Sequence, residues 1–280
     1  MGKVISISNQ KGGVGKTTTV VNLASSLAAA QKKTLIIDFD PQANATSGIG
    51  VDREGIEKSI YDALVGETDI KEMIVEVEPD SLKGYLCAVP ATPELAGAEI
   101  ELIHLEHREW RLKRAIESIA AEFEFILIDC PPSLSLLTVN ALTASDSVLI
   151  PVQCEYYAME GLGQLKRTIS LIKQRLNPEL AVEGYLLTMF DSRNNICHVV
   201  ANELKSYFGG DVFETIINRN VKLAESPSFG KPALLYDIKS MGAQSYIALA
   251  QELIKRNSPV VSTGAEKILG GAGVEKNYFG

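Results

Sequence analysis

A glycine-rich loop lies between the first apolar run of the chain and a segment with helical spacing. The run covers residues 4–8, the loop reads NQKGGVGKTT over residues 9–18, and apolar residues then recur at helical spacing from Val20 to Leu27. Glycines let backbone N–H groups turn inward around phosphate oxygens, and the N-terminus of a helix adds partial positive charge there. The order of strand, loop and helix therefore predicts a nucleotide-binding site.

The side chains of this loop have separate expected roles. Lys16 is expected to reach the β- and γ-phosphates of ATP, and Thr17 to place its hydroxyl on Mg²⁺. The common phosphate-loop pattern G-x-x-x-x-G-K-[ST] is not met at its first position, where Gln10 stands, and Lys11 is a lysine that the common loop lacks. The alternative is a chance glycine-rich turn with two solvated lysines, and the flanking strand and helix argue against it. The residues of the loop expected to bind the nucleotide are Lys11, Gly12, Gly13, Val14, Gly15, Lys16, Thr17 and Thr18.

Two further apolar runs end in carboxylates. Residues 35–38 read LIID and are followed by Phe39 and Asp40, and residues 125–129 read FILID. Because parallel strands present their carboxyl ends at one edge of a sheet, Asp40 and Asp129 are expected beside the phosphate loop. Asp129 looks like the Walker B carboxylate, which acts on Mg²⁺ directly or through water. An aspartate after a strand can also cap a helix. However, the ends of three strands, one before the glycine loop and two before carboxylates, are expected to meet at one site, which favours phosphate chemistry.

Short aliphatic and β-branched runs alternate with helix-period segments along almost the whole chain. This pattern predicts an α/β fold of the P-loop NTPase type, with a mostly parallel, twisted sheet flanked by helices on both faces. Helices are expected over residues 162–176, with a basic outer side, and over 246–254, and an acidic, irregular insertion with short helices over 49–101. One domain is expected over residues 1–257, followed by a flexible tail at 258–280. The strands are expected at residues 4–8, 34–38, 125–129, 147–151, 182–189 and 212–217.

The overall charge excludes one class of protein. A formal net charge of −8 and a pI of about 5.1 count against a protein that coats nucleic acid with its whole surface. Residues 161–256 nevertheless hold 12 Lys and Arg against 9 Asp and Glu, so a local basic patch is expected there. The sequence shows neither a signal peptide nor an apolar run long enough to span a membrane, which predicts a cytoplasmic protein.

Cysteine and histidine are expected to play no part in the chemistry. The cysteines form no C-x-x-C pair, and buried free thiols are expected. His104 and His107 are expected on one helical face beside several glutamates, which favours a solvated helix over a metal site. The four cysteines are Cys87, Cys130, Cys154 and Cys197.

Several segments, in order along the chain, resemble the chromosomal ParA and Soj partition ATPases. The sequence KGGVGKT resembles the deviant Walker A motif of the ParA, MinD and nitrogenase iron-protein class. The further matching segments are DFDPQANATS at 38–47, DCPPS at 129–133, PVQCE at 151–155 and RNVKLAESPSFGKP at 219–232. The resemblance extends from Lys3 to about Arg256.

The resemblance implies an ATP-sandwich homodimer, in which Lys11 crosses the interface to the other copy's nucleotide and Asp40 orients the attacking water. Lys11, Lys16 and Asp40 are therefore the expected catalytic residues, with ATP and Mg²⁺ as ligands. It also implies non-specific binding of double-stranded DNA, stimulation of ATP hydrolysis by a ParB-type centromere-binding protein, and a cytoplasmic, nucleoid-associated location. The expected DNA-binding residues are Arg193, Arg219, Lys222, Lys166 and Arg167.

Two departures limit what the resemblance implies. Asn218 stands where relatives commonly have proline, near the loop that cradles adenine, and is expected to contact the nucleotide. Nothing precedes the first strand that would form the added helix-turn-helix domain of some plasmid partition proteins, so operator-specific repression is not expected.

Three other functions stay open from the sequence. A MinD-like, membrane-associated positioning ATPase would end in a basic amphipathic helix, and residues 258–280 show no such stripe. A relative of the redox iron protein would need paired cysteines to hold an iron–sulfur cluster between subunits, and Cys130 alone is thin support. A ParA-like ATPase that positions a cargo other than DNA would carry the same motifs.

Overall fold

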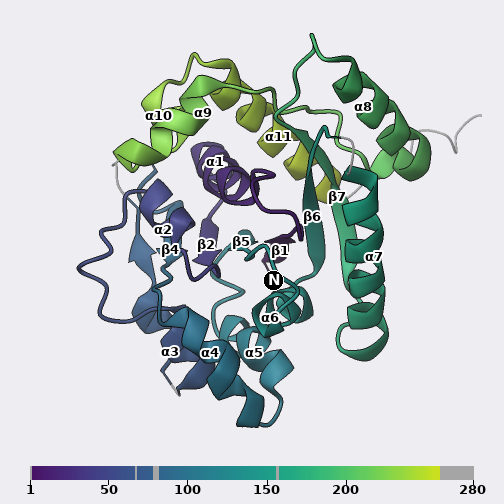
Figure 1. Ribbon diagram of the computed structural model, residues 1–280. Coiled ribbons are helices and arrows are strands. Elements are labelled where there is room, and N and C mark those ends of the chain that lie inside the picture. Colours follow the sequence, from purple (N-terminus) through teal and green to yellow (C-terminus); the bar gives the residue numbers. More distant parts are fainter. Residues whose placement is uncertain (1, 67, 78–81, 156–157, 259–280) are drawn as a thin grey trace, which may run out of the picture.

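A seven-stranded sheet forms the centre of the molecule (Figure 1). The computed structural model describes residues 2–66, 68–77, 82–155 and 158–258. The strand order is β3-β4-β2-β5-β1-β6-β7, and every pairing is parallel except that of β3 with β4. The strands are β1 (Lys3–Ile7), β2 (Thr34–Asp38), β3 (Val75–Glu76), β4 (Leu86–Val89), β5 (Phe125–Asp129), β6 (Ser147–Gln153) and β7 (Ala181–Thr188).

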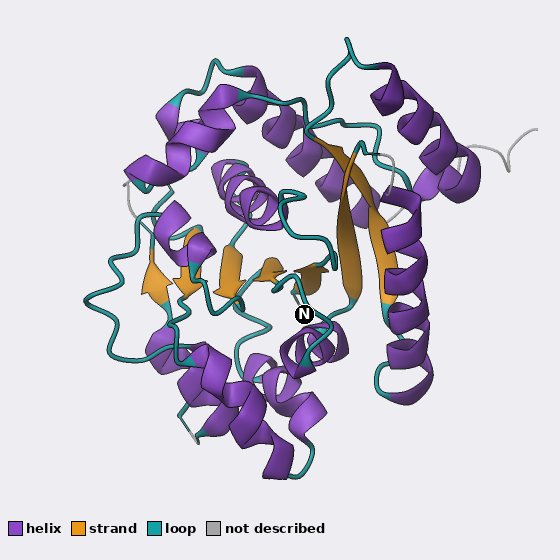
Figure 2. Cartoon of the chain, in the orientation of Figure 1, coloured by secondary structure: helices purple, strands orange, loops and turns teal. Residues whose placement is uncertain are grey.

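Helices cover both faces of this sheet (Figures 1 and 2). Helices α1, α9, α10 and α11 lie on one side, helices α3 to α6 lie on the other, and α7 and α8 lie beside β6 and β7. The helices are α1 (Lys16–Ala29), α2 (Asn44–Gly48), α3 (Ile60–Val65), α4 (Leu95–Glu101), α5 (Arg111–Glu117), α6 (Leu136–Ala144), α7 (Ala158–Arg175), α8 (Asn195–Phe208), α9 (Val221–Glu225), α10 (Ala233–Tyr236) and α11 (Met241–Asn257). The predicted α/β class, with a mostly parallel sheet between two layers of helices, is confirmed.

The central strands are apolar throughout because both of their faces are covered. Ile36 and Leu127 belong to the core on the side of α1 and α11, whereas Ile37 and Ile128 belong to the core on the side of α3 to α6. All four side chains are fully buried. Since side chains alternate along a strand, the residues that follow, Asp38 and Asp129, point to the side of α1.

Five of the six expected strands are confirmed within two residues at each end, and both expected helices are confirmed but begin earlier than expected, α7 by four residues and α11 by five. Strands β1, β2, β5, β6 and β7 and helices α7 and α11 all lie where the sequence pattern predicts them. The expected stripe of α7 is buried and its basic residues are exposed. The buried residues of that stripe are Leu162, Leu165, Ile169 and Ile172.

The strand expected at residues 212–217 is wrong. Isolated bridges flank this segment, between Tyr185 and Val212 and between Phe190 and Asn218, and within it only the amides of Phe213 and Ile217 donate to carbonyls of β7. The backbone amides of Glu214 and Thr215 donate instead to the carboxylate of Glu252 on α11, both at 2.9 Å. Because these amides are used by a side chain, the middle of the segment cannot continue the ladder of β7.

The expectation for residues 49–101 is wrong in part. The segment does hold the short helices α3 and α4, but it also holds β3 and β4. Strand β4 is an integral strand of the sheet, paired in parallel with β2 from Thr34↔Leu86 to Ile37↔Val89. The run of four residues in β4 is too short to stand out as a strand in an otherwise acidic segment.

The shared helical face expected for His104 and His107 is also wrong. His104 ends one 3-10 turn, Leu102–His104, and His107 has a φ of 53°, which breaks the helix between them. Cys130, Cys154 and Cys197 are buried free thiols, as expected, and Cys87 is half-buried.

The domain limits stay a prediction, because the expected tail lies, from residue 259 onward, outside the described residues. Within the ranges that the structure covers, no helix is both long enough and apolar enough to cross a membrane.

Candidate nucleotide site

The glycine-rich loop joins the carboxyl end of β1 to the first turn of α1. Gly13 and Gly15 have φ values of 74° and 88°, in the left-handed region that favours glycine, and Gly15 is the N-cap of the helix. A Cβ atom on Gly12 or Gly13 would meet no other atom within 4 Å, so the outer side of the loop is open. The conformation matches one that turns backbone N–H groups toward a bound anion.

Neighbouring strands fix the loop in place. The Asn9 amide donates to the carbonyl of Pro151 at the end of β6, at 2.7 Å, and the Lys11 N–H donates to Asn9 Oδ1 at 3.1 Å. On the far side, the Thr188 hydroxyl at the end of β7 donates to the carbonyl of Val14, at 2.8 Å. Neither Asn9 nor Thr188 had an expected role, because the loop meets β6 and β7 only in the folded chain.

Lys16 lies inside the site, with only 6% of its surface exposed. Its ammonium donates to the carbonyl of Lys11, at 3.3 Å. Burial lowers the pKa of Lys16, and the nearby charges of Asp129 and Asp40 partly offset that shift. Thr17 and Thr18 follow in the first turn of α1, both half-buried.

Asp129 is a buried carboxylate that lacks a partner. Its surface is fully buried, and neither of its oxygens has a hydrogen-bond partner of normal geometry among the described residues, although the Thr17 hydroxyl lies close by. Burial and the nearby charge of Asp38 raise the pKa of Asp129 well above its ordinary value, while Thr17 and Lys16 lower it. An orphaned carboxylate beside a threonine and a lysine suits a hard cation and its water ligands, so Thr17 and Asp129 fit Mg²⁺.

The other two aspartates at this edge differ in their surroundings. Asp38 is the direct neighbour of Asp129 in the sheet, and its Oδ2 accepts hydrogen bonds from the N–H and the hydroxyl of Thr46, both at 2.7 Å. Burial raises the pKa of Asp38 to about 6, although the bonds from Thr46 lower it. Asp40 is 8% exposed, and its Oδ1 accepts the Gln42 N–H at 2.9 Å. Asp38 therefore anchors α2, a role that the sequence did not reveal, while one oxygen of Asp40 accepts only a backbone bond.

Lys11 points away from Lys16 in this structure. Its ammonium forms an ion pair with the carboxylate of Glu155, which follows β6. Asn218 lines a separate cavity of about 190 Å³ next to the loop, together with Gly15, Thr18 and Tyr246. The expected site residues from Lys11 to Thr18, together with Asp40, Asp129 and Asn218, thus come together at one end of the sheet.

The residues expected to contact DNA lie in three places. Arg193 is 87% exposed and pairs with Asp191 at 2.7 Å, and Arg219 is close enough for its charge to help lower the pKa of Asp191 to about 2. Lys222 on α9 pairs with Glu225 at 3.0 Å. The exposed Lys166 and Arg167 lie on α7, with the Lys166 ammonium 5.6 Å from the ring centre of Phe208. The structure therefore brings Arg193 and Arg219 together around Asp191, with Lys222 three residues further along the chain and Lys166 and Arg167 on a different element, α7.

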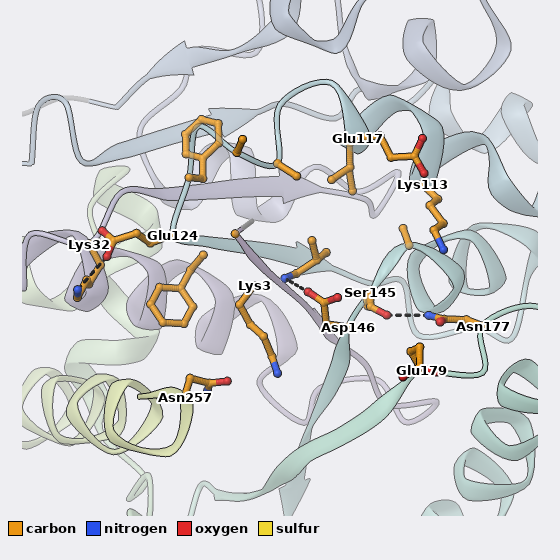
Figure 3. A pocket seen from close by; sticks show the side chains of 18 of the residues that line it. Lys3, Lys32, Lys113, Glu117, Glu124, Ser145, Asp146, Asn177, Glu179 and Asn257 are labelled. Carbon is orange, nitrogen blue, oxygen red and sulfur yellow. Dashed lines mark hydrogen bonds and ion pairs between the residues drawn. The ribbon is translucent and has the colours of Figure 1, made fainter. Parts of the chain in front are cut away.

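A cavity of about 880 Å³ elsewhere in the described part of the chain is not this site (Figure 3). It lies at the amino ends of β1, β5 and β6, whereas the phosphate loop lies at the carboxyl end of β1. Several of its charged groups are already used: Lys32 pairs with Glu124 at 2.8 Å, and Asp146 accepts the Val4 N–H at 2.8 Å. Its position excludes it as the nucleotide pocket.

Comparison with known proteins gives matches over most of the chain. The profile of a family described as "AAA domain" matches residues 2–182. The chromosome partitioning protein ParA of Myxococcus xanthus (strain DK1622) is 59% identical over 259 residues, which cover 92% of this chain and 90% of that protein. The sporulation initiation inhibitor protein Soj of Bacillus subtilis (strain 168) is 54% identical over 253 residues, covering 90% and 98%. The crystal structure of cobyrinic acid a,c-diamide synthase from Mycobacterium smegmatis, with a bound ATP analogue and magnesium, superposes with a TM-score of 0.79 at 34% identity, covering 91% of this chain and 95% of that one.

Proposed function

Because the chain belongs to the ParA/Soj family of chromosome-partitioning ATPases, we propose that it binds ATP with Mg²⁺ and hydrolyses it. The ATP-bound copies pair into a homodimer, and this dimer binds double-stranded DNA without sequence preference. A ParB-type centromere-binding protein stimulates hydrolysis, which returns the copies to a form that leaves DNA. The cycle drives chromosome or plasmid partition, and it places the protein on the nucleoid in the cytoplasm.

The observation that carries this proposal is the unpartnered carboxylate of Asp129 beside the buried ammonium of Lys16. Leaving a buried charged group without a hydrogen bond costs free energy, so a site of this kind is built for a ligand. The open glycine loop in front of it supplies N–H groups and the positive end of α1. A triphosphate with its cation satisfies all of these groups together. The cobyrinic acid a,c-diamide synthase of similar fold, crystallised with an ATP analogue and magnesium, supports the same ligands here.

Each residue of the site then has a share in phosphoryl transfer. Thr17 and Asp129 would hold Mg²⁺, which would supply positive charge to the phosphates of the nucleotide. Lys16 holds the same phosphates from the loop, and its burial strengthens that attraction because water is excluded. Asp40 positions the attacking water through its carboxylate. Lys11 adds positive charge to the nucleotide of the second copy, so hydrolysis requires the dimer.

The DNA-binding surface is proposed around Arg193 and Arg219, which the fold brings together beside Asp191. Arg193 is the better placed of the two, since its guanidinium is largely exposed. Lys222, Lys166 and Arg167 are more distant additions to the same surface. Binding of phosphates by these side chains makes the affinity for DNA fall steeply as salt is raised.

A DNA-shift assay at constant salt tests this cycle. It compares the chain without nucleotide, with ADP, and with a slowly hydrolysed ATP analogue, each with Mg²⁺, on two duplexes of unrelated sequence. We expect a shift of both duplexes with the analogue alone. An equal shift under all three conditions would contradict a nucleotide switch, and a shift of one duplex alone would contradict non-specific binding.

A further inference from the structure

We propose that Glu155 is a positioning residue for Lys11, which it holds within the same chain until two copies pair. The inference rests on the function proposed above, in which Lys11 serves the nucleotide of the second copy. Its basis is the ion pair between the Lys11 ammonium and the Glu155 carboxylate, which joins residues 144 positions apart. Both side chains are partly exposed, Lys11 at 40% and Glu155 at 47%.

The fold places these two residues together through the pairing of β1 with β6. The two strands pair in parallel from Ile5↔Ser147 to Ile7↔Leu149, so the segments that follow them leave the sheet at the same edge. The bond from Asn9 to the carbonyl of Pro151 then fixes the start of the loop against the end of β6. Lys11 follows Asn9 by two residues and Glu155 follows β6 by two, which brings the ammonium to the carboxylate.

Both the carbonyl and the ammonium of Lys11 are bonded within one chain. Its carbonyl accepts the bond from the Lys16 ammonium, and its own ammonium is occupied by Glu155. The exposed glycines Gly12 and Gly13 follow Lys11, and a Cβ atom on either would meet no described atom within 4 Å, so these two positions leave room for a second copy. An ammonium that reaches a phosphate on another chain has to leave this carboxylate first. Pairing of two copies therefore breaks two such contacts.

The size of the restraint follows from its exposure. Ion pairs between partly exposed side chains shift an equilibrium by about 1.4-fold to 5-fold. Because a dimer breaks two of them, the dissociation constant of the dimer rises by about 2-fold to 30-fold over that of a chain without the contact. Glu155 thus sets a threshold for ATP-dependent pairing without preventing it.

The test uses Glu155→Gln in the full chain, with Glu124→Gln as the matched control. Glu124 is also 47% exposed and pairs with Lys32, far from the loop. The first measurement is the rate at which an acetylating reagent modifies Lys11 in the nucleotide-free chain, read by mass spectrometry. The second is the dissociation constant of the dimer with a slowly hydrolysed ATP analogue and Mg²⁺, read by analytical ultracentrifugation.

We expect Glu155→Gln to speed the modification of Lys11 by about 1.4-fold to 5-fold and to tighten the dimer by about 2-fold to 30-fold, with neither change in Glu124→Gln. An unchanged rate at Lys11 would overturn the inference. A Glu155→Gln dimer that is no tighter than the dimer of the unmodified chain would also overturn the inference. Glu155 would then be a charge at the edge of the interface, or a contact that the dimer needs. Absence of any analogue-dependent dimer in the unmodified chain is a different result, since it overturns the proposed function and the inference with it.

Discussion

The carboxylate of Asp129 is the group whose replacement tests the site most directly. Asp129→Asn keeps the size of the side chain but removes its charge from a position where no described residue offers a hydrogen bond of normal geometry. The free protein should therefore become more stable, although a ligand site has been damaged. Mg²⁺-dependent stabilisation by ATP should be lost at the same time, because the cation loses a charged partner.

The magnitudes follow from burial. A hydrogen bond to a charged group is worth about 1.5–3 kcal/mol and one to a neutral group about 0.5–1.5 kcal/mol. Asparagine keeps its own unmet hydrogen bonds, so removal of the charge alone should stabilise the free chain by roughly 1–1.5 kcal/mol. For a chain of this size that corresponds to a rise in Tm of about 2–3 °C. A ligand present at a hundred times its Kd stabilises the wild-type chain by about 2.7 kcal/mol, and Asp129→Asn should forfeit most of that gain.

The pH dependence has a definite sign. The pKa of Asp129 is raised in the folded state, so the folded chain keeps this proton at a pH where the unfolded chain has lost it. The free energy of unfolding therefore falls as the pH rises from the ordinary value of 3.8 toward the raised one. Asp38 contributes with the same sign, but only up to its pKa of about 6. The wild type and Asp129→Asn should differ most above pH 6.

Thermal unfolding between pH 5 and 8.5 measures these effects, with no ligand, with ATP and Mg²⁺, and with ATP and a chelator. Glu117→Gln, an exposed carboxylate on α5, is the control and should leave all three curves unchanged. The reasoning is refuted if Asp129→Asn lowers the Tm of the free protein while the shift caused by ATP and Mg²⁺ stays intact. That outcome would mean that the carboxylate has a structural partner and does not hold the cation.

Three further substitutions address the other roles. Lys16→Ala should weaken ATP binding by roughly tenfold to a hundredfold, because about 1.5–3 kcal/mol of charge-assisted hydrogen bonding is lost. Unchanged affinity for ATP in isothermal titration calorimetry would contradict this role. Asp40→Ala should still bind ATP but hydrolyse it far more slowly, and so accumulate as a DNA-binding dimer; wild-type phosphate release would rule out its part in positioning water. Arg193→Glu should dimerise normally while its affinity for DNA and the salt dependence of that affinity both fall. Equal DNA binding at moderate salt would remove Arg193 from the DNA surface.

The sequence alone was sufficient for features that depend on local order and on alternation. A glycine loop between an apolar strand and a helix can fold in few ways, and parallel strands bring their carboxyl ends to one edge. The order of apolar runs and carboxylates along the chain therefore places Asp40 and Asp129 beside the loop. The buried stripe of α7 follows in the same way, from apolar residues spaced every three or four positions.

The sequence failed where the outcome depended on a distant segment. Residues 212–217 have the composition of a strand, but Glu252 takes two of their amides, and only the packing of α11 makes that possible. Strand β4 is too short to be recognised by its own pattern, and it is stabilised by its pairing with β2.

The partners of the site residues were decided by the tertiary structure alone. Asp38 resembles the other strand-terminal aspartates in sequence, yet Thr46 occupies its carboxylate, while Asp129, its neighbour in the sheet, has no partner among the described residues. Lys11 and Glu155 meet only because β6 lies next to β1. Local sequence determines which groups are present at the edge of the sheet, but their charge and hydrogen bonding depend on which strands are adjacent, and that adjacency exists only in the folded chain.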